Sequence, residues 1–97
     1  MAKDYFNHEI NIGDVVLYNE RGSRGYCSTF SEGIVIQIGN QKLENSRITI
    51  VPEENLDCYK CDDGTISRYR TDCKYSTNVV NLTALDVREN QAYKIGE

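Results

Sequence analysis

Cys58-Tyr-Lys-Cys61-Asp-Asp-Gly64 is the stretch that decides between two folds for this chain of 97 residues. As Cys-x-x-Cys it is half of a zinc site and indicates a metal-stapled module. As alternating side chains that run into Asp-Asp-Gly it is a strand entering a hairpin turn, in which Gly64 takes the left-handed conformation. We favour the hairpin. Residues three apart in a strand have Cα atoms about 10 Å apart, whereas two thiolates on one zinc lie within about 4 Å of each other.

Alternation of apolar and polar residues on both sides of this stretch predicts five or six short strands. The clearest is Gly33-Ile-Val-Ile-Gln-Ile-Gly39, which places three isoleucines on one face between two glycines. The strand over residues 47–51 stops at Pro52, because proline cannot donate to a ladder. Further strands are predicted over residues 12–18, 56–61, 65–70 and 78–82.

Length and element spacing indicate one all-β domain. A chain of this size with a single proline buries one core, and turns every 8 to 12 residues or so are typical of a small sandwich or barrel. We expect a flexible arm over residues 1–9, a β-barrel over residues 10–86 and a polar tail over residues 87–97. One or two helical turns are expected over residues 83–86, near the C-terminus.

The order of these motifs resembles the SH3-like small β-barrels, the KOW and Tudor types included. Gly13-Asp14-Val-Val is followed by a long polar loop, by Gly33-Ile-Val-Ile, by an Asp63-Gly64 hairpin and by a closing Val-Val strand. The resemblance covers residues 10–85; it implies a barrel of five to six antiparallel strands and no activity. The composition, poor in Ala and rich in Asn, Ile and Tyr, is also similar to that of small bacteriophage accessory proteins.

Charge is unevenly distributed along the chain. The net charge of −4 equals the contribution of residues 53–63, which hold five carboxylates and one lysine. A mildly basic segment follows, with Arg68, Arg70 and Lys74 against Asp72. An acidic domain is a poor general binder of nucleic acid, because affinity for phosphate comes largely from counterions released by Lys and Arg.

The N-terminal ten residues lack the apolar core of a secretion signal, and no apolar run approaches the roughly 18 residues that span a bilayer. We therefore expect a small soluble cytoplasmic protein with no membrane contact. Its cysteines should be reduced and pack as small apolar residues. We expect no metal and no cofactor; the ligands of a zinc ion would be Cys58, Cys61, Cys73 and Cys27.

No group of residues predicts catalysis. A cysteine nucleophile needs a nearby base, and the single histidine, His8, lies on the expected flexible arm, where a lone histidine is typical of a solvated residue. The adjacent carboxylates Glu53-Glu54 and Asp62-Asp63 are typical of solvated turns. Gly22-Ser-Arg-Gly25 lies between two strands and precedes no helix N-terminus that could bind phosphate. We expect a non-enzymatic protein without catalytic residues.

The loop over residues 19–31 is the first candidate for partner binding. At thirteen residues it exceeds the usual hairpin connection, and Arg and Tyr are enriched at binding hot spots. It predicts a protein-protein interaction module, such as a phage-type accessory or host-interaction factor that binds a host or virion component. Alternatively, its aromatic residues cap the open end of the barrel. The candidate residues are Arg21, Arg24, Tyr26 and Phe30.

A second candidate surface surrounds the predicted hairpin. Alternation places Arg68 and Arg70 on one side, with Lys60 across the turn and Lys74 beyond it. Such a stripe can contact phosphates, which makes a nucleic-acid or ribonucleoprotein accessory module the alternative function. The stripe can equally be a solvated face paired with the acidic segment. A zinc-stabilised β module is the third possibility.

Overall fold

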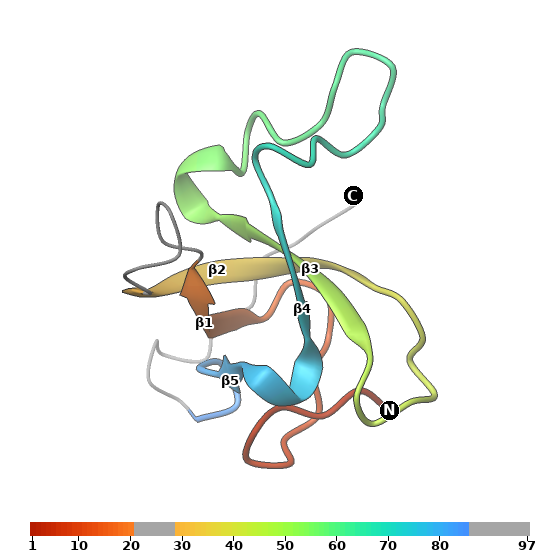
Figure 1. The fold of residues 1–97 in the computed structure, drawn as a ribbon, viewed down its shortest axis with the longest axis vertical. Helices are drawn as coiled ribbons and strands as arrows, with labels where there is room; N and C mark the ends of the chain where they lie inside the picture. The colour runs from red at the N-terminus through yellow and green to blue at the C-terminus, as the bar shows by residue number, and fades with distance from the viewer. Residues whose placement is uncertain (21–28, 86–97) are drawn as a thin grey trace.

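The strand-forming segments of the chain assemble into one antiparallel sheet. The structure, a computed structural model, describes residues 1–20 and 29–85. Five strands lie in the order β4-β3-β2-β1-β5 (Figure 1). Within the described residues the helical elements are two 3-10 turns, and none is long and apolar enough to cross a membrane. The elements are β1 (Val15–Glu20), β2 (Thr29–Ile38), β3 (Arg47–Pro52), η2 (Glu53–Asn55), β4 (Asp72–Tyr75), η3 (Ser76–Asn78) and β5 (Val80–Asn81).

The first four strands form a meander, and β5 returns to the far side of β1. All four pairings are antiparallel. The register between β2 and β3 shifts between Val35 and Gln37, which places a bulge at Ile36. Because a bulge changes the face that the following residues occupy, Ile38 packs with the cluster of Val35. The expectation that the three isoleucines of this strand share one face is therefore wrong for the third of them.

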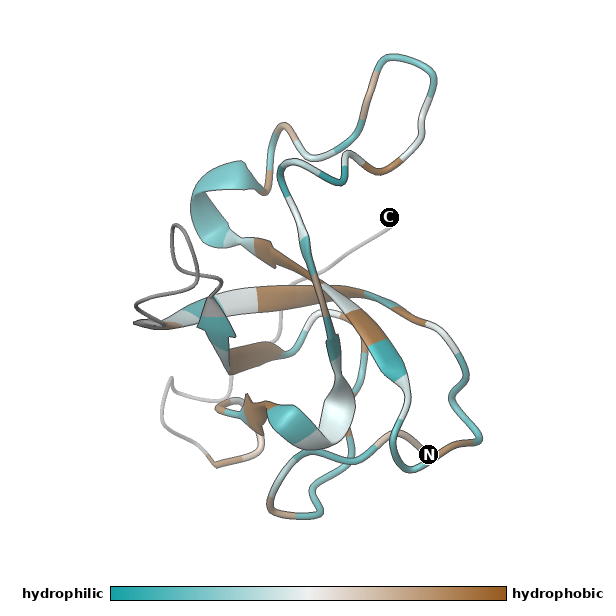
Figure 2. Ribbon diagram, viewed as in Figure 1, coloured by the Kyte–Doolittle hydropathy of each residue, from teal (hydrophilic) through white to brown (hydrophobic). Residues whose placement is uncertain are grey.

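The sheet buries apolar side chains on both of its faces, and Figure 2 shows hydrophobic segments along β1, β2 and β3. Gly33 is needed where β2 crosses this core, because a Cβ there would lie 2.5 Å from Ile50 Cγ2 and 2.9 Å from Tyr18 Cε1. The first cluster contains Ile10, Val16, Tyr18, Val35, Ile48, Ile50 and Val79, and the second contains Val15, Ile34, Ile36, Val51 and Tyr59.

The predicted hairpin is only partly confirmed. Gly64 has φ +88°, and the N–H of Cys61 donates to the carbonyl of Thr65 at 2.7 Å, as a tight turn requires. The flanking residues 56–61 and 65–70 are not strands, however, and share a single bridge between Lys60 and Ile66. The strand after the turn is β4, several residues later than predicted.

Local side-chain hydrogen bonds explain the displaced strand. The hydroxyl of Thr71 donates to the Ser67 carbonyl at 2.9 Å, and the N–H of Tyr69 donates to Ser67 Oγ at 3.3 Å. Ser and Thr that bond nearby backbone offer an alternative to a strand ladder. Residues 67–71 therefore form a turn, and extended pairing resumes only with Asp72. Near the other end of the chain, residues 82–85 form a turn and not a helix.

The N-terminal segment folds onto the sheet, which differs from the flexible arm expected from the sequence. Ala2 is 1% exposed. The N–H of Lys3 donates to the carbonyl of Glu44 at 2.8 Å, and the N–H of Tyr5 donates to the carbonyl of Val79 at 2.9 Å. These contacts join residues 1–9 to the β2–β3 connection and to Val79, the residue before β5.

Candidate functional site

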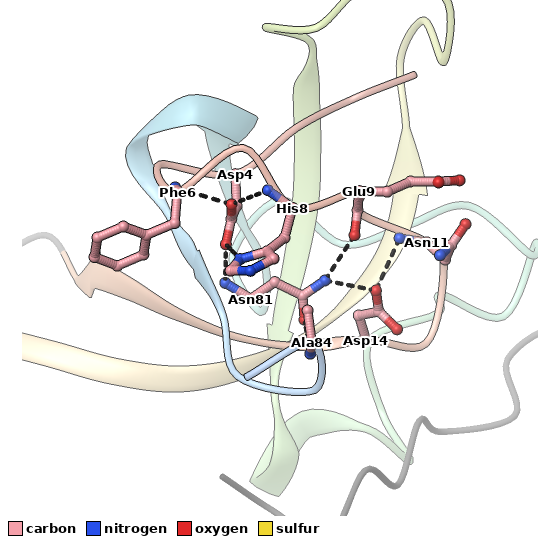
Figure 3. Close-up of polar contacts among 8 residues, drawn as sticks. All are labelled: Asp4, Phe6, His8, Glu9, Asn11, Asp14, Asn81 and Ala84. Atoms are coloured by element: carbon pink, nitrogen blue, oxygen red, sulfur yellow. Dashed lines mark hydrogen bonds and ion pairs between the residues drawn. The ribbon is translucent and has the colours of Figure 1, made fainter. Parts of the chain in front are cut away.

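The carboxylate of Asp4, which is 2% exposed, accepts three backbone hydrogen bonds within the part of the chain that the structure describes. Its Oδ1 accepts the N–H groups of Phe6 at 2.9 Å and His8 at 2.7 Å, and its Oδ2 accepts the N–H of Asn81 at 2.7 Å (Figure 3). Nδ1 of His8 lies 3.5 Å from the same Oδ2. The single histidine of the sequence therefore lies beside a buried acid, in a turn whose backbone N–H groups donate to that acid.

Asn81 extends this network to a second buried carboxylate. Its Nδ2 donates to the carbonyl of Glu9 at 3.0 Å and to Oδ2 of Asp14 at 2.8 Å, and its Oδ1 accepts the N–H of Ala84 at 3.2 Å. Oδ2 of Asp14 also accepts the N–H of Asn11 at 2.9 Å. Figure 3 shows these groups converging from the N-terminal segment, the entry to β1 and the end of β5.

The chain's own backbone donors occupy this network. Both carboxylate oxygens of Asp4 accept hydrogen bonds from backbone N–H groups. Oδ2 of Asp14 accepts one backbone N–H and the side-chain amide of Asn81. Buried charges are stabilised by such donors. The network therefore stabilises the fold by joining chain segments near the β5 edge of the sheet.

At the opposite edge, three adjoining pockets follow β4. The first, of about 350 Å³, lies between η2 and Tyr69; the second, of about 370 Å³, lies beside Lys74; the third, of about 250 Å³, lies at Tyr75. Arg68 lines both the first and the second, and Arg47 lines both the second and the third. We name these three pockets together the β4 groove; its basic and aromatic residues are Arg47, Arg68, Tyr69, Arg70, Lys74 and Tyr75.

A hydrogen-bonded turn holds the most exposed aromatic ring of the groove. Tyr69 is 93% exposed. Besides the two bonds to Ser67 described above, the N–H of Arg70 donates to the Ser67 carbonyl at 3.3 Å, and Nδ2 of Asn55 donates to the Arg70 carbonyl at 3.3 Å. The Arg70 guanidinium donates to the carbonyl of Cys58. The backbone that carries Tyr69 is therefore fixed from both sides.

The cations of the groove have no carboxylate partner among the described residues. The ion pair found in that part of the chain joins His8 to Asp4. The guanidinium carbon of Arg47 lies 6.0 Å from the ring centroid of Tyr75, within reach of a cation-π interaction. Two carboxylates, Glu54 and Asp72, also line the groove. It is thus a mixed-charge surface in which positive groups predominate.

The structure brings together most of the second predicted surface. Arg68, Arg70 and Lys74 line the groove, whereas Lys60 lines none of its three pockets, and its Nζ lies 5.8 Å from the ring centroid of Tyr59. The sequence analysis left open that these cations form ion pairs with the acidic segment; the ion pair among the described residues does not involve them. Arg47 and Tyr75 were missed, because their contact depends on the β3–β4 register.

The first predicted surface lies mostly outside the described residues. Arg21, Arg24 and Tyr26 belong to residues 21–28, which the structure does not describe. Phe30 is described on β2 and is 72% exposed. This exposure does not fit the alternative in which Phe30 caps the open end of the barrel.

The described cysteines carry free thiols. Cys58 is half-buried, with Sγ 3.8 Å from Oδ1 of Asn55, while Cys61 and Cys73 are exposed. Residues 1–20 and 29–85 contain no group of three or more His, Cys, Asp or Glu side chains that could hold a metal ion. Cys27 lies outside these ranges. The strand geometry used against a Cys58–Cys61 zinc pair does not apply, because that segment is a turn.

Comparison with known proteins gives a family without a function. A family model described as a domain of unknown function (DUF7205) matches residues 2–82. These residues include all five strands and the whole β4 groove. No curated protein and no solved structure matches the chain.

Proposed function

This chain belongs to the DUF7205 family of domains of unknown function, and from the β4 groove we propose that it is a non-enzymatic module that binds another protein. One observation carries the proposal. Tyr69 is 93% exposed on a turn fixed by hydrogen bonds, between two arginines that have no carboxylate partner among the described residues.

An aromatic ring held in this way suits a protein interface. Tyr and Arg are the residue types enriched at binding hot spots, where they fill pockets of the partner. A fixed backbone reduces the conformational entropy lost on association. The turn that holds Tyr69 ahead of binding therefore supports a role as the central contact of an interface.

The charges of the groove favour a protein over nucleic acid. Glu54 and Asp72 line the same pockets as the arginines, and the acidic segment over residues 53–63 begins at the groove. A phosphate chain is uniformly negative and is repelled by these groups, whereas a protein surface can present charges of both signs. The partner surface is expected to carry carboxylates opposite Arg68 and Arg70.

Three further attributes are proposed with this function. The meander of β1 to β4, with β5 returning to β1, supports the SH3-like barrel resemblance. The free thiols of Cys58, Cys61 and Cys73 support a reducing, cytoplasmic location. A phage-type accessory or host-interaction role rests on composition alone.

Nucleic-acid binding is the second candidate, favoured by the absence of described ion pairs at Arg47, Arg68, Arg70 and Lys74. It predicts binding to a single-stranded oligonucleotide that falls steeply as salt rises, because counterion release drives it. Arg68→Ala with Arg70→Ala should then weaken binding. No binding at low salt removes this candidate.

The loop over residues 19–31 is proposed as an additional contact of the same protein partner. Phe30, the one of its four candidate residues that the structure describes, is exposed. Tyr26→Ala with Phe30→Ala should weaken partner capture if the loop takes part, and unchanged capture would confine the interface to the groove.

The test is capture of a protein partner by the immobilised chain from the extract of its native host. Arg68→Ala with Tyr69→Ala should abolish the capture, whereas two controls outside the groove should not. Lys60→Ala removes one positive charge, and Tyr5→Ala removes an aromatic ring that is 70% exposed. Capture by the groove variant equal to that by the controls would refute the proposal.

A further inference from the structure

β4 forms one end of the sheet, and no described strand pairs with its outer side. An edge strand exposes backbone N–H and C=O groups that can pair with another chain. The three pockets of the groove lie along this same strand, from Asp72 at its start to Tyr75 at its end. The groove therefore offers backbone N–H and C=O groups that pair with no described strand, as well as side chains.

The hydrogen bonds of neighbouring residues show which amides of β4 face outward. The N–H of Ser76 donates to the Ser46 carbonyl at 2.7 Å, and the N–H of Gly39 donates to the Arg47 carbonyl at 2.8 Å. Bonded pairs recur at every second residue of an antiparallel ladder. Backbone groups of Asp72 and Lys74 thus face β3, while those of Cys73 and Tyr75 face away from it.

The two faces of this edge differ in chemistry. Lys74 pairs with the buried Ile48, so its side chain lies on the face of the first core cluster. Tyr75 pairs with the exposed Arg47, so its side chain lies on the opposite face of the sheet. An inward-pointing lysine at an edge disfavours pairing with an apolar strand. A strand with a carboxylate opposite Lys74 instead neutralises this charge.

We infer that the protein partner presents an extended acidic segment, which adds to the outer side of β4 as an antiparallel strand. This inference rests on the proposed function and specifies its mode of binding. N–H and C=O groups of Cys73 and Tyr75 pair with the segment. Its carboxylates lie on the face of Lys74, opposite that residue and toward Arg70, and its apolar side chains lie on the other face, near Tyr75.

Charge complementarity selects this occupant. Four cations in or beside the edge have no described carboxylate partner, and the third pocket adds Leu43, which is 53% exposed, beside Tyr75. Main-chain bonds supply affinity in strand addition and alternate side chains supply specificity. The pattern that fits is acidic and apolar in alternation, with a neutral polar residue opposite Asp72.

The probe is an end-capped peptide, Val-Glu-Val-Thr-Val-Glu-Val, with its binding followed by fluorescence anisotropy on the full chain. The same peptide with Lys in place of Glu should bind at least about tenfold more weakly, and Lys74→Glu should weaken the acidic peptide similarly. Lys60→Ala should leave its affinity within about twofold, because rim charges outside an interface contribute little.

Methylated peptides test the ladder without altering the protein. N-methylation of the valines beside the central Thr blocks amides that face β4 and should weaken binding at least about tenfold, whereas N-methylation of the Glu residues, whose amides face away, should not. Saturating peptide should slow hydrogen exchange of the Cys73 and Tyr75 amides by about tenfold or more.

No binding of the acidic peptide, or equal loss from both methylated forms, overturns strand addition. Binding of an oligothymidylate at the same site, with no peptide binding, overturns it in favour of nucleic acid. If partner capture still depends on Arg68 and Tyr69 while Cys73 and Tyr75 gain no protection, strand addition fails and the proposed function stands. If capture is indifferent to those residues, the proposed function itself fails.

Discussion

Asp4→Ala should remove the anchor that joins the N-terminal segment to β5. The carboxylate accepts three backbone N–H groups, from Phe6, His8 and Asn81. The bond from Asn81 is buried, and leaving such a donor unsatisfied costs about 1–3 kcal/mol. Water can reach the two partly buried donors, so each of those adds less, roughly 0.5–1 kcal/mol. We expect a total loss of about 3 kcal/mol.

A loss of this size is large for a domain of this length, whose free energy of unfolding is typically about 5–15 kcal/mol. Urea unfolding followed by far-ultraviolet circular dichroism measures it, and the melting temperature should fall by about 12–24 °C. Asp62→Ala is the control, since Asp62 is exposed; it should change stability by less than about 0.5 kcal/mol. A loss below about 1 kcal/mol for Asp4→Ala, with an unchanged m-value, would refute the assignment of this network to fold stability.

Three other predictions concern Gly33, the carboxylate of Asp63 and the cysteines. Gly33→Ala should destabilise the fold by about 1–3 kcal/mol, because its Cβ would overlap Ile50 and Tyr18; an unchanged thermal midpoint would contradict this close approach. The hydroxyl of Thr65 donates to Oδ1 of Asp63 at 2.7 Å and its N–H donates to the same oxygen at 3.0 Å. The hydroxyl bond first, and then the N–H bond, lowers the pKa of Asp63, so Thr65→Val should raise that pKa in an NMR titration. Because the folded pKa is lowered, the associated stability is present above the unfolded-state pKa and is lost as pH falls through the folded one; no change in the titration would refute the contact. Protein purified without chelator should contain less than about half an equivalent of zinc by elemental analysis, since fewer than a full set of ligands meets among the described residues; a full equivalent would require the three described cysteines to converge with Cys27.

Local pattern predicts the centre of the sheet well. Alternation and flanking glycines identify β2, and Pro52 is the last residue of β3, one beyond the predicted end. The bulge at Ile36 and the start of β4 at Asp72 were not predicted. Both depend on choices that alternation does not encode: a register shift in one case, and local bonding by Ser67 in the other.

Contacts between distant residues explain what else the sequence missed. Asp4 and Asn81 are 77 positions apart, so nothing in the local pattern of residues 1–9 indicates that the segment is anchored. The basic residues Arg68, Arg70 and Lys74 were identified from the uneven distribution of charge along the chain and from strand alternation, although residues 67–71 form a turn and not a strand. Arg47 joins them only through the β3–β4 pairing, which requires β4 to be placed correctly first.

The central claim is that a protein partner contacts Tyr69 in the β4 groove. A photo-crosslinking amino acid placed at position 69, with the same group at position 5 as the control, tests it in the native host. We predict a crosslinked adduct from position 69 that protease removes and nuclease does not, and none from position 5. An adduct that nuclease removes, or equal adducts from the two positions, would contradict the account.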